Sequence, residues 1–179
     1  IKLVSLILLS ASIEKNKWVE LFNGKDLDGW EVKINGYEFG ENYRNTFKVQ
    51  DGSIKVSYER YRKFGDRFGH LFYTKKEFKN YILSLDYKFS GEHLRGAPGW
   101  SIKNSGVMLH SQDPRTMLKN QEFPVSAEAQ LLGGVGIGER PTANLCTPGT
   151  EIDIGGKMAA GHCINSNSKT YDDEWINIK

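Results

Sequence analysis

The fold is decided by two segments, N-S-G-V-M-L-H-S-Q (Asn104 to Gln112) and V-S-A-E-A-Q-L-L-G-G (Val125 to Gly134). Both alternate with the two-residue period of a β-strand, which sends successive side chains to opposite faces of a sheet. One face of this pair is small and apolar, as a packed core requires. The opposite face gathers an imidazole, a carboxylate and two amides, from His110, Glu128, Asn104 and Gln130.

These four polar side chains suit a polar ligand better than scattered lysines and glutamates would. The alternative interpretation is an ordinary solvated sheet face, which also carries polar residues. The segment Tyr81 to Phe89 repeats the alternation and places Asp86 and Lys88 opposite its apolar face. If all three strands share one sheet, we expect Asp86 and Lys88 to join the polar face.

Short alternating runs separated by glycine turns continue along the chain, which contains 19 glycines. Thr46 to Val56 is typical of a hairpin, because Asp51-Gly52 supplies a tight turn between two such runs. Further strands are expected at His70–Thr74, Glu151–Ile154 and Trp175–Ile178. No segment has helical periodicity beyond about three turns, so the pattern predicts an all-β sandwich of antiparallel sheets.

Length and charge restrict the function classes. A chain of 179 residues can bury one sizeable core and is expected to form one domain. Its net charge of +2 predicts no nucleic-acid partner. The sequence contains no phosphate-binding loop, dinucleotide fingerprint or nucleophile elbow.

The first residues, 1–12, read I-K-L-V-S-L-I-L-L-S-A-S. One lysine before a short apolar run that ends in small residues indicates the remnant of a signal peptide, and hence a secreted or periplasmic protein. An N-terminal strand or helix is the alternative, and the run is too short for a membrane span. We expect one domain over residues 18–179 and, because W-I-N-I-K resembles the beginning of a strand, further C-terminal strands after it.

Two cysteines, Cys146 and Cys163, are present. An exported protein permits a disulfide between them, and this is the preferred prediction. Two buried thiols are the second alternative. A metal site is the third, and it needs more ligands than these cysteines and His162 supply.

Four motifs in order resemble the 3-keto-disaccharide hydrolase family, formerly a domain of unknown function. They are L-F-N-G-K-D-L-D-G-W (Leu21 to Trp30), H-L-F-Y-T-K-K-E-F-K-N-Y-I-L-S-L-D-Y-K-F (His70 to Phe89), N-S-G-V-M-L-H and A-E-A-Q-L-L-G. The resemblance runs from Trp18 to the C-terminus. It implies a concanavalin-like jelly-roll sandwich whose concave sheet receives sugar, in secreted or periplasmic proteins. The sequence departs from the family at His110, where arginine is frequent, and lacks the family's closing strands.

The resemblance implies cleavage of glycosides whose glucose ring carries a 3-keto group. That ketone acidifies the proton on C2, so a base can remove it while the C1 substituent leaves, and water then adds back. His110 and Glu128 are the candidate catalytic residues. Candidate substrate-binding residues are Asp86, Lys88, Asn104, Gln130 and Trp100. The sequence identifies no certain cofactor, but a divalent metal ion could polarise the carbonyl, with Glu128, His110 and Asp86 as its ligands.

Two other function classes fit the same pattern. Sandwiches of this kind also serve as carbohydrate-binding modules without catalysis, because fold does not decide function. A structural domain without a ligand is the third class. The predicted partner is therefore a carbohydrate, acted upon in the first class and only bound in the second.

Overall fold

The computed structural model describes residues 2–10, 18–136, 138–170 and 174–179. Across these residues the chain forms short antiparallel strands, and its helical segments are three 3-10 turns: η1 (Tyr43–Asn45), η2 (Gly99–Ser101) and η3 (Pro114–Thr116). The prediction of an all-β sandwich of antiparallel sheets is confirmed. Among the described residues, no helix is long and apolar enough to cross a membrane.

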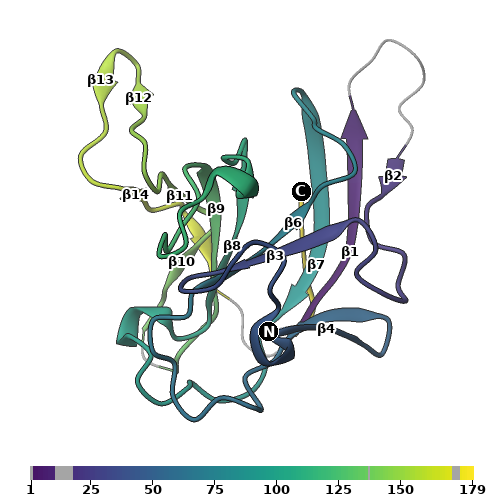
Figure 1. Cartoon of the computed structure of the whole chain (residues 1–179). Coiled ribbons are helices and arrows are strands. Elements are labelled where there is room, and N and C mark those ends of the chain that lie inside the picture. The colour runs from purple at the N-terminus through teal and green to yellow at the C-terminus, as the bar shows by residue number, and fades with distance from the viewer. Residues whose placement is uncertain (1, 11–17, 137, 171–173) are drawn as a thin grey trace.

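The first layer is a six-stranded sheet in the order β16-β7-β1-β5-β4, with β2 paired to β1 (Figure 1). Its strands are β1 (Lys2–Ser10), β2 (Trp18–Glu20), β4 (Phe47–Gln50), β5 (Ser53–Val56), β7 (Tyr81–Lys88) and β16 (Ile176–Ile178). The predicted hairpin is present as β4 and β5. Asp51 and Gly52 both have positive φ, 52° and 69°, as the tight turn between twisted strands requires.

The N-terminal run forms strand β1, which pairs antiparallel with β7 from Lys2 opposite Lys88 to Ser10 opposite Tyr81. A strand was the alternative to a signal peptide at this end. This pairing does not test processing during export, and residues 11 and 12 lie outside the described part of the chain, so the signal-peptide interpretation of residues 1–12 remains a prediction.

The second layer consists of two separate pieces. A four-stranded sheet has the order β14-β11-β9-β8, from β8 (Asn104–Leu109), β9 (Ala127–Leu132), β11 (Asn144–Cys146) and β14 (Cys163–Ile164). The other piece is the pair β3 (Trp30–Ile34) and β6 (Gly69–Tyr73). Small pairs complete the fold: β10 (Pro141–Thr142) with β15 (Ser168–Lys169), and β12 (Asp153–Ile154) with β13 (Lys157–Met158), which projects from one end (Figure 1).

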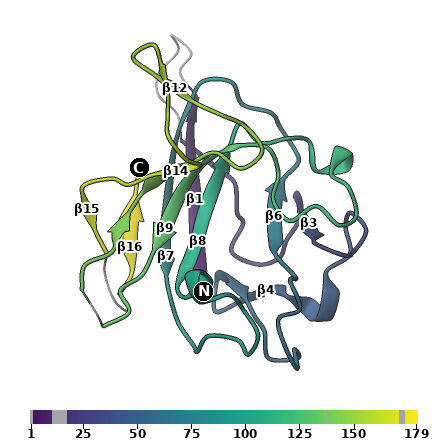
Figure 2. The same ribbon diagram turned by 90° about the vertical axis from the view of Figure 1, so that its left-hand side faces the viewer.

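Each piece of the second layer packs on the first layer through its own core. Leu85 and Tyr87 of β7 contact Leu131 of β9, with Val107 of β8 against them. In Figure 2, β8 and β9 stand in front of the first-layer strands β1 and β7 and run in nearly the same direction. Under the other piece, Val32 and Ile34 of β3 pack on Phe47 of β4. The alternation predicted for β7, β8 and β9 therefore identified one of the two cores.

Candidate active site

A cavity of about 1390 Å³ lies where the two pieces of the second layer meet. All of β6 and all of β8 contribute to its walls, and Leu83 and Leu85 of β7 line it as well. Within the described part of the chain, β6 pairs only with β3 and β8 only with β9, so no described strand bridges the two walls. The volume is large enough for a small-molecule ligand of several rings.

Glu128 is the most unusual side chain of this cavity. It lies on β9 opposite Met108 of β8 and faces the cavity. Its carboxylate accepts no hydrogen bond from any described residue, and burial raises its pKa to about 7. A carboxylic acid with such a pKa exchanges a proton readily near neutral pH, as a general acid or base must.

The position of Glu128 depends on a glycine of the neighbouring strand. A Cβ atom at Gly106 would stand 2.7 Å from both Cγ and Cδ of Glu128, and closer still to Oε1. A Cβ atom does not approach non-bonded atoms this closely, so only glycine allows the carboxylate to lie across β8 in this way. Gly106 has no distinguishing sequence signal besides its place between Asn104 and Met108 on one face of an alternating strand.

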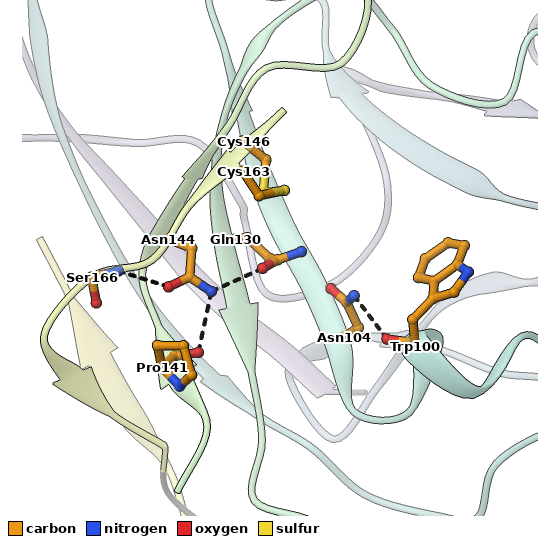
Figure 3. Close-up of a disulfide and its surroundings, with 8 residues drawn as sticks. All are labelled: Trp100, Asn104, Gln130, Pro141, Asn144, Cys146, Cys163 and Ser166. Carbon is orange, nitrogen blue, oxygen red and sulfur yellow. Dashed lines mark hydrogen bonds between the residues drawn. A yellow bond between two sulfur atoms is a disulfide. The ribbon is translucent and has the colours of Figure 1, made fainter. Parts of the chain in front are cut away.

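The amides of the polar face are fixed by hydrogen bonds. Asn144 of β11 lies opposite Gln130 and donates from Nδ2 to Gln130 Oε1, 2.9 Å away, and to the Pro141 carbonyl (Figure 3). Its own Oδ1 accepts from the Ser166 amide. These bonds set the orientation of the Gln130 amide. Gln130 shares a sheet face with Glu128 but does not contribute to the cavity wall.

The disulfide stands at the end of the same row of residues. Cys146 pairs in register with Glu128 on one side and with Cys163 on the other, and the two sulfur atoms are bonded (Figure 3). The predicted disulfide is therefore present. It closes a segment that includes the β12–β13 hairpin, and so attaches that hairpin to the sheet carrying Glu128.

Asn104 and Trp100 lie together at the beginning of β8. The Asn104 amide donates from Nδ2 to the Trp100 carbonyl, 3.1 Å away (Figure 3). Both residues line the cavity, and the Trp100 side chain is 55% exposed. Both residues were predicted to bind substrate, and that role remains a prediction.

His110 lies at the edge of the cavity, beyond the end of β8. The strand ends at Leu109, and His110 adopts a left-handed φ of 48°. Its exposed ring lies 5.4 Å from that of Tyr81, and both residues line the cavity. The strict alternation that placed His110 on the face of Glu128 does not extend to it, because the chain turns there.

Asp86 and Lys88 require a correction. They lie on β7, in the other layer, on the side opposite the core residues Leu85 and Tyr87. Asp86 accepts a hydrogen bond from Asn177 of β16 at 2.8 Å. The structure therefore does not bring Asp86 and Lys88 to the face of Glu128, because β7 is not a neighbour of β8 in one sheet.

The proposed metal ligands are separated for the same reason. Asp86 is in the other layer, and no group of three histidine, cysteine, aspartate or glutamate side chains in the described residues could hold a metal ion. The pKa of Glu128 is shifted by burial alone, and no charged side chain of the described residues influences it. Glu128, His110 and Asp86 do not fit a divalent cation, and we derive no step through one.

The family of the chain is shown by comparison with known sequences. The profile of the 3-keto-alpha-glucoside-1,2-lyase-like domain matches residues 17–179, which is most of the chain. The chain belongs to this family. No curated protein and no solved structure gives a match. Two motifs that resemble this family carry the residues of the site. N-S-G-V-M-L-H contains Gly106, and A-E-A-Q-L-L-G contains Glu128 and Gln130.

Proposed function

We propose that this domain cleaves the glycosidic bond of 3-keto-α-glucosides by elimination across C1 and C2, followed by addition of water. The observation that carries the proposal is the Glu128 carboxylate, which faces a large cavity without a partner and has its pKa raised to about 7 by burial. Membership in a family named for this chemistry supports a carbohydrate as the substrate class.

Each step of the reaction balances with groups of this chain. The ionised Glu128 takes the proton from C2, whose acidity comes from the neighbouring ketone. The electron pair of the C2–H bond forms the C1–C2 double bond as the C1–O bond breaks, and the leaving oxygen takes up a proton. His110 lines the same cavity and is our candidate donor of that proton.

Addition of water completes the hydrolysis. The oxygen of water bonds to C1 as one water proton passes to His110, which gave its own proton to the leaving oxygen. The protonated Glu128 returns a proton to C2, which restores the 3-keto sugar, the carboxylate and the imidazolium. Asn104, which lines the cavity, is our candidate donor of an amide hydrogen to a sugar hydroxyl, whereas Gln130 lies outside the cavity wall and is assigned no contact with the sugar. A two-carboxylate displacement, as in ordinary glycosidases, fits less well, because no second carboxyl group among the described residues influences the pKa of Glu128.

Replacement of Glu128 by the isosteric amide tests the proposal. Glu128→Gln should reduce turnover of methyl 3-keto-α-glucoside by about 10²–10⁴-fold, the contribution of one general base. Glu139→Gln is the matched control, because Glu139 is exposed and pairs with Lys169 outside the cavity. Deuterium from solvent should appear at C2 of the product. Full turnover by Glu128→Gln, or a product without deuterium at C2, would refute this mechanism.

A carbohydrate-binding module is the rival function, and the exposed Trp100 at the cavity wall favours it equally. The same assay separates the two. Binding of the glucoside by the unmodified protein without turnover would establish the module and exclude the enzyme.

We also propose that the protein is exported, to the periplasm or beyond. The Cys146–Cys163 disulfide supports an oxidising compartment, since such bonds are rare in the cytosol. Fractionation of cells that produce the protein, followed by a count of free thiols in each fraction, tests this assignment. Recovery in the cytosol with both thiols free would contradict it.

A further inference from the structure

An aromatic pair forms part of the cavity wall at the beginning of β8. The rings of Phe68 and Trp100 are stacked, with centroids 5.5 Å apart and planes within 8° of parallel. One face of the indole is therefore covered by Phe68. Since Trp100 remains 55% exposed, its other face is open. Both residues line the same cavity as Glu128.

This pair, the Phe68–Trp100 shelf, is held in place before any ligand arrives. Phe68 packs edge-on against the buried Phe64 and is tilted against Phe123, at centroid distances of 4.9 and 5.0 Å. The main chain of Trp100 is fixed by the hydrogen bond from Asn104. A surface that is already rigid loses little conformational entropy when a ligand binds to it.

The main chain of the shelf and the carboxylate contact β8 at two different residues. Glu128 lies over Gly106, and Asn104, which holds Trp100, is two residues earlier on the strand. A strand rises by 3.2–3.4 Å per residue, so this separation is about 7 Å. Phe68, Trp100 and Glu128 thus line one cavity, and its volume of about 1390 Å³ accommodates more than one sugar ring.

We propose that the Phe68–Trp100 shelf is the subsite for the second pyranose ring of a disaccharide substrate, next to the ring that reacts at Glu128. The inference rests on the proposed function for the assignment of the reacting ring. A pyranose presents a flat face of C–H groups, which an exposed indole can cover and remove from water. The shelf carries no charge, so a neutral sugar fits it better than a charged substituent does.

The test compares ligands of one and two rings that cannot react. NMR titration should show that the unmodified protein binds maltose about 10-fold more tightly than methyl α-glucoside. Trp100→Ala should abolish this advantage and leave methyl α-glucoside binding unchanged, whereas Trp100→Phe should keep most of it. Trp175→Ala is the matched control, because Trp175 is 48% exposed and does not line the cavity.

Three outcomes would overturn the shelf as the second subsite. They are no two-ring advantage in the unmodified protein, an advantage that survives Trp100→Ala, and an equal loss for both ligands. Turnover of 3-keto glucosides is measured separately. A two-ring advantage that depends on Trp100, in a protein without turnover, would refute the proposed function and would keep the shelf only as a binding site for a sugar ring.

Discussion

The carboxylate of Glu128 on β9 lies directly over the backbone of Gly106 on the neighbouring strand β8. No other described residue donates a hydrogen bond to it. Its direction is thus set by the absence of a side chain at position 106 and not by a polar partner. A single methyl group on β8 is enough to test this relationship.

Gly106→Ala should displace the Glu128 carboxylate and reduce turnover by up to about 100-fold, the cost of misplacing a reacting group by about 1 Å. The φ of Gly106 is not left-handed, so alanine introduces no backbone strain. Gly99→Ala is the control, because a Cβ there meets nothing within 4 Å. Kinetics of both variants on a 3-keto-α-glucoside provide the measurement. Equal rates in both variants would show that the position of the carboxylate does not depend on Gly106.

The free energy of unfolding should depend on pH through Glu128. Its pKa is about 7 in the folded protein and 4.5 in the unfolded chain, so the folded state binds the extra proton between these values. The stabilisation from this proton is complete below pH 4.5 and is lost as the pH rises through 7. Glu128→Gln should then be more stable than the unmodified protein at pH 8, by about 2 kcal/mol after allowance for partial exposure.

Denaturant unfolding of both proteins at pH 5 and pH 8 measures this difference. The advantage of Glu128→Gln should be small at pH 5 and near its full value at pH 8. A difference in free energy of unfolding that does not change with pH would mean that burial does not shift the pKa of Glu128.

The sequence predicted the individual strands of the site, but not the layer to which each strand belongs. The alternation of Tyr81–Lys88, Asn104–Leu109 and Ala127–Leu132 predicted the strands and the core residues Leu85 and Leu131, because side-chain direction within a strand is local. It did not predict that β7 lies in the other layer, since strand partners are chosen by packing between distant segments. Asp86 was misplaced for this reason.

Other elements were missed although their signal was present. W-E-V-K-I alternates over Trp30–Ile34 and forms β3, with Val32 and Ile34 in the second core. The shelf could not be foreseen, because Phe68 and Trp100 meet only once β6 and β8 face the same cavity. Nor does composition show that Lys33 is buried, with its ammonium group donating to three main-chain carbonyls.

Removal of the disulfide should lower the free energy of unfolding of the protein. The bond joins residues 17 positions apart, and loss of such a constraint on the unfolded chain costs roughly 3 kcal/mol in the chain-entropy model. Denaturant unfolding of the Cys146→Ala, Cys163→Ala double variant measures the loss. Unchanged stability would show that the unfolded chain is compact with or without the bond.

His70 should make the protein sensitive to acid. It lies on β6 directly opposite Lys33, and Nε2 is 2.7 Å from the carbonyl oxygen of Glu122, which attaches the loop before β9 to the β3–β6 pair. Burial, with a smaller effect from the charge of Lys33, lowers the pKa of His70 to about 4, despite the opposing effect of the carbonyl. The neutral ring is therefore the form that the fold accommodates, with Nε2–H donating to Glu122.

The sign of the effect follows from the lowered pKa. Above the unfolded value of 6.5 both states are neutral and the stabilisation is complete, and it is lost as the pH falls towards 4, because only the unfolded chain gains the proton. His70→Gln keeps an N–H donor for Glu122 but cannot titrate. Between pH 7 and pH 4.5 the unmodified protein should lose about 2 kcal/mol more unfolding free energy than this variant. His162→Gln, at an exposed position, is the control, and equal acid sensitivity of all three proteins would show that His70 is protonated as easily in the folded state as in the unfolded chain.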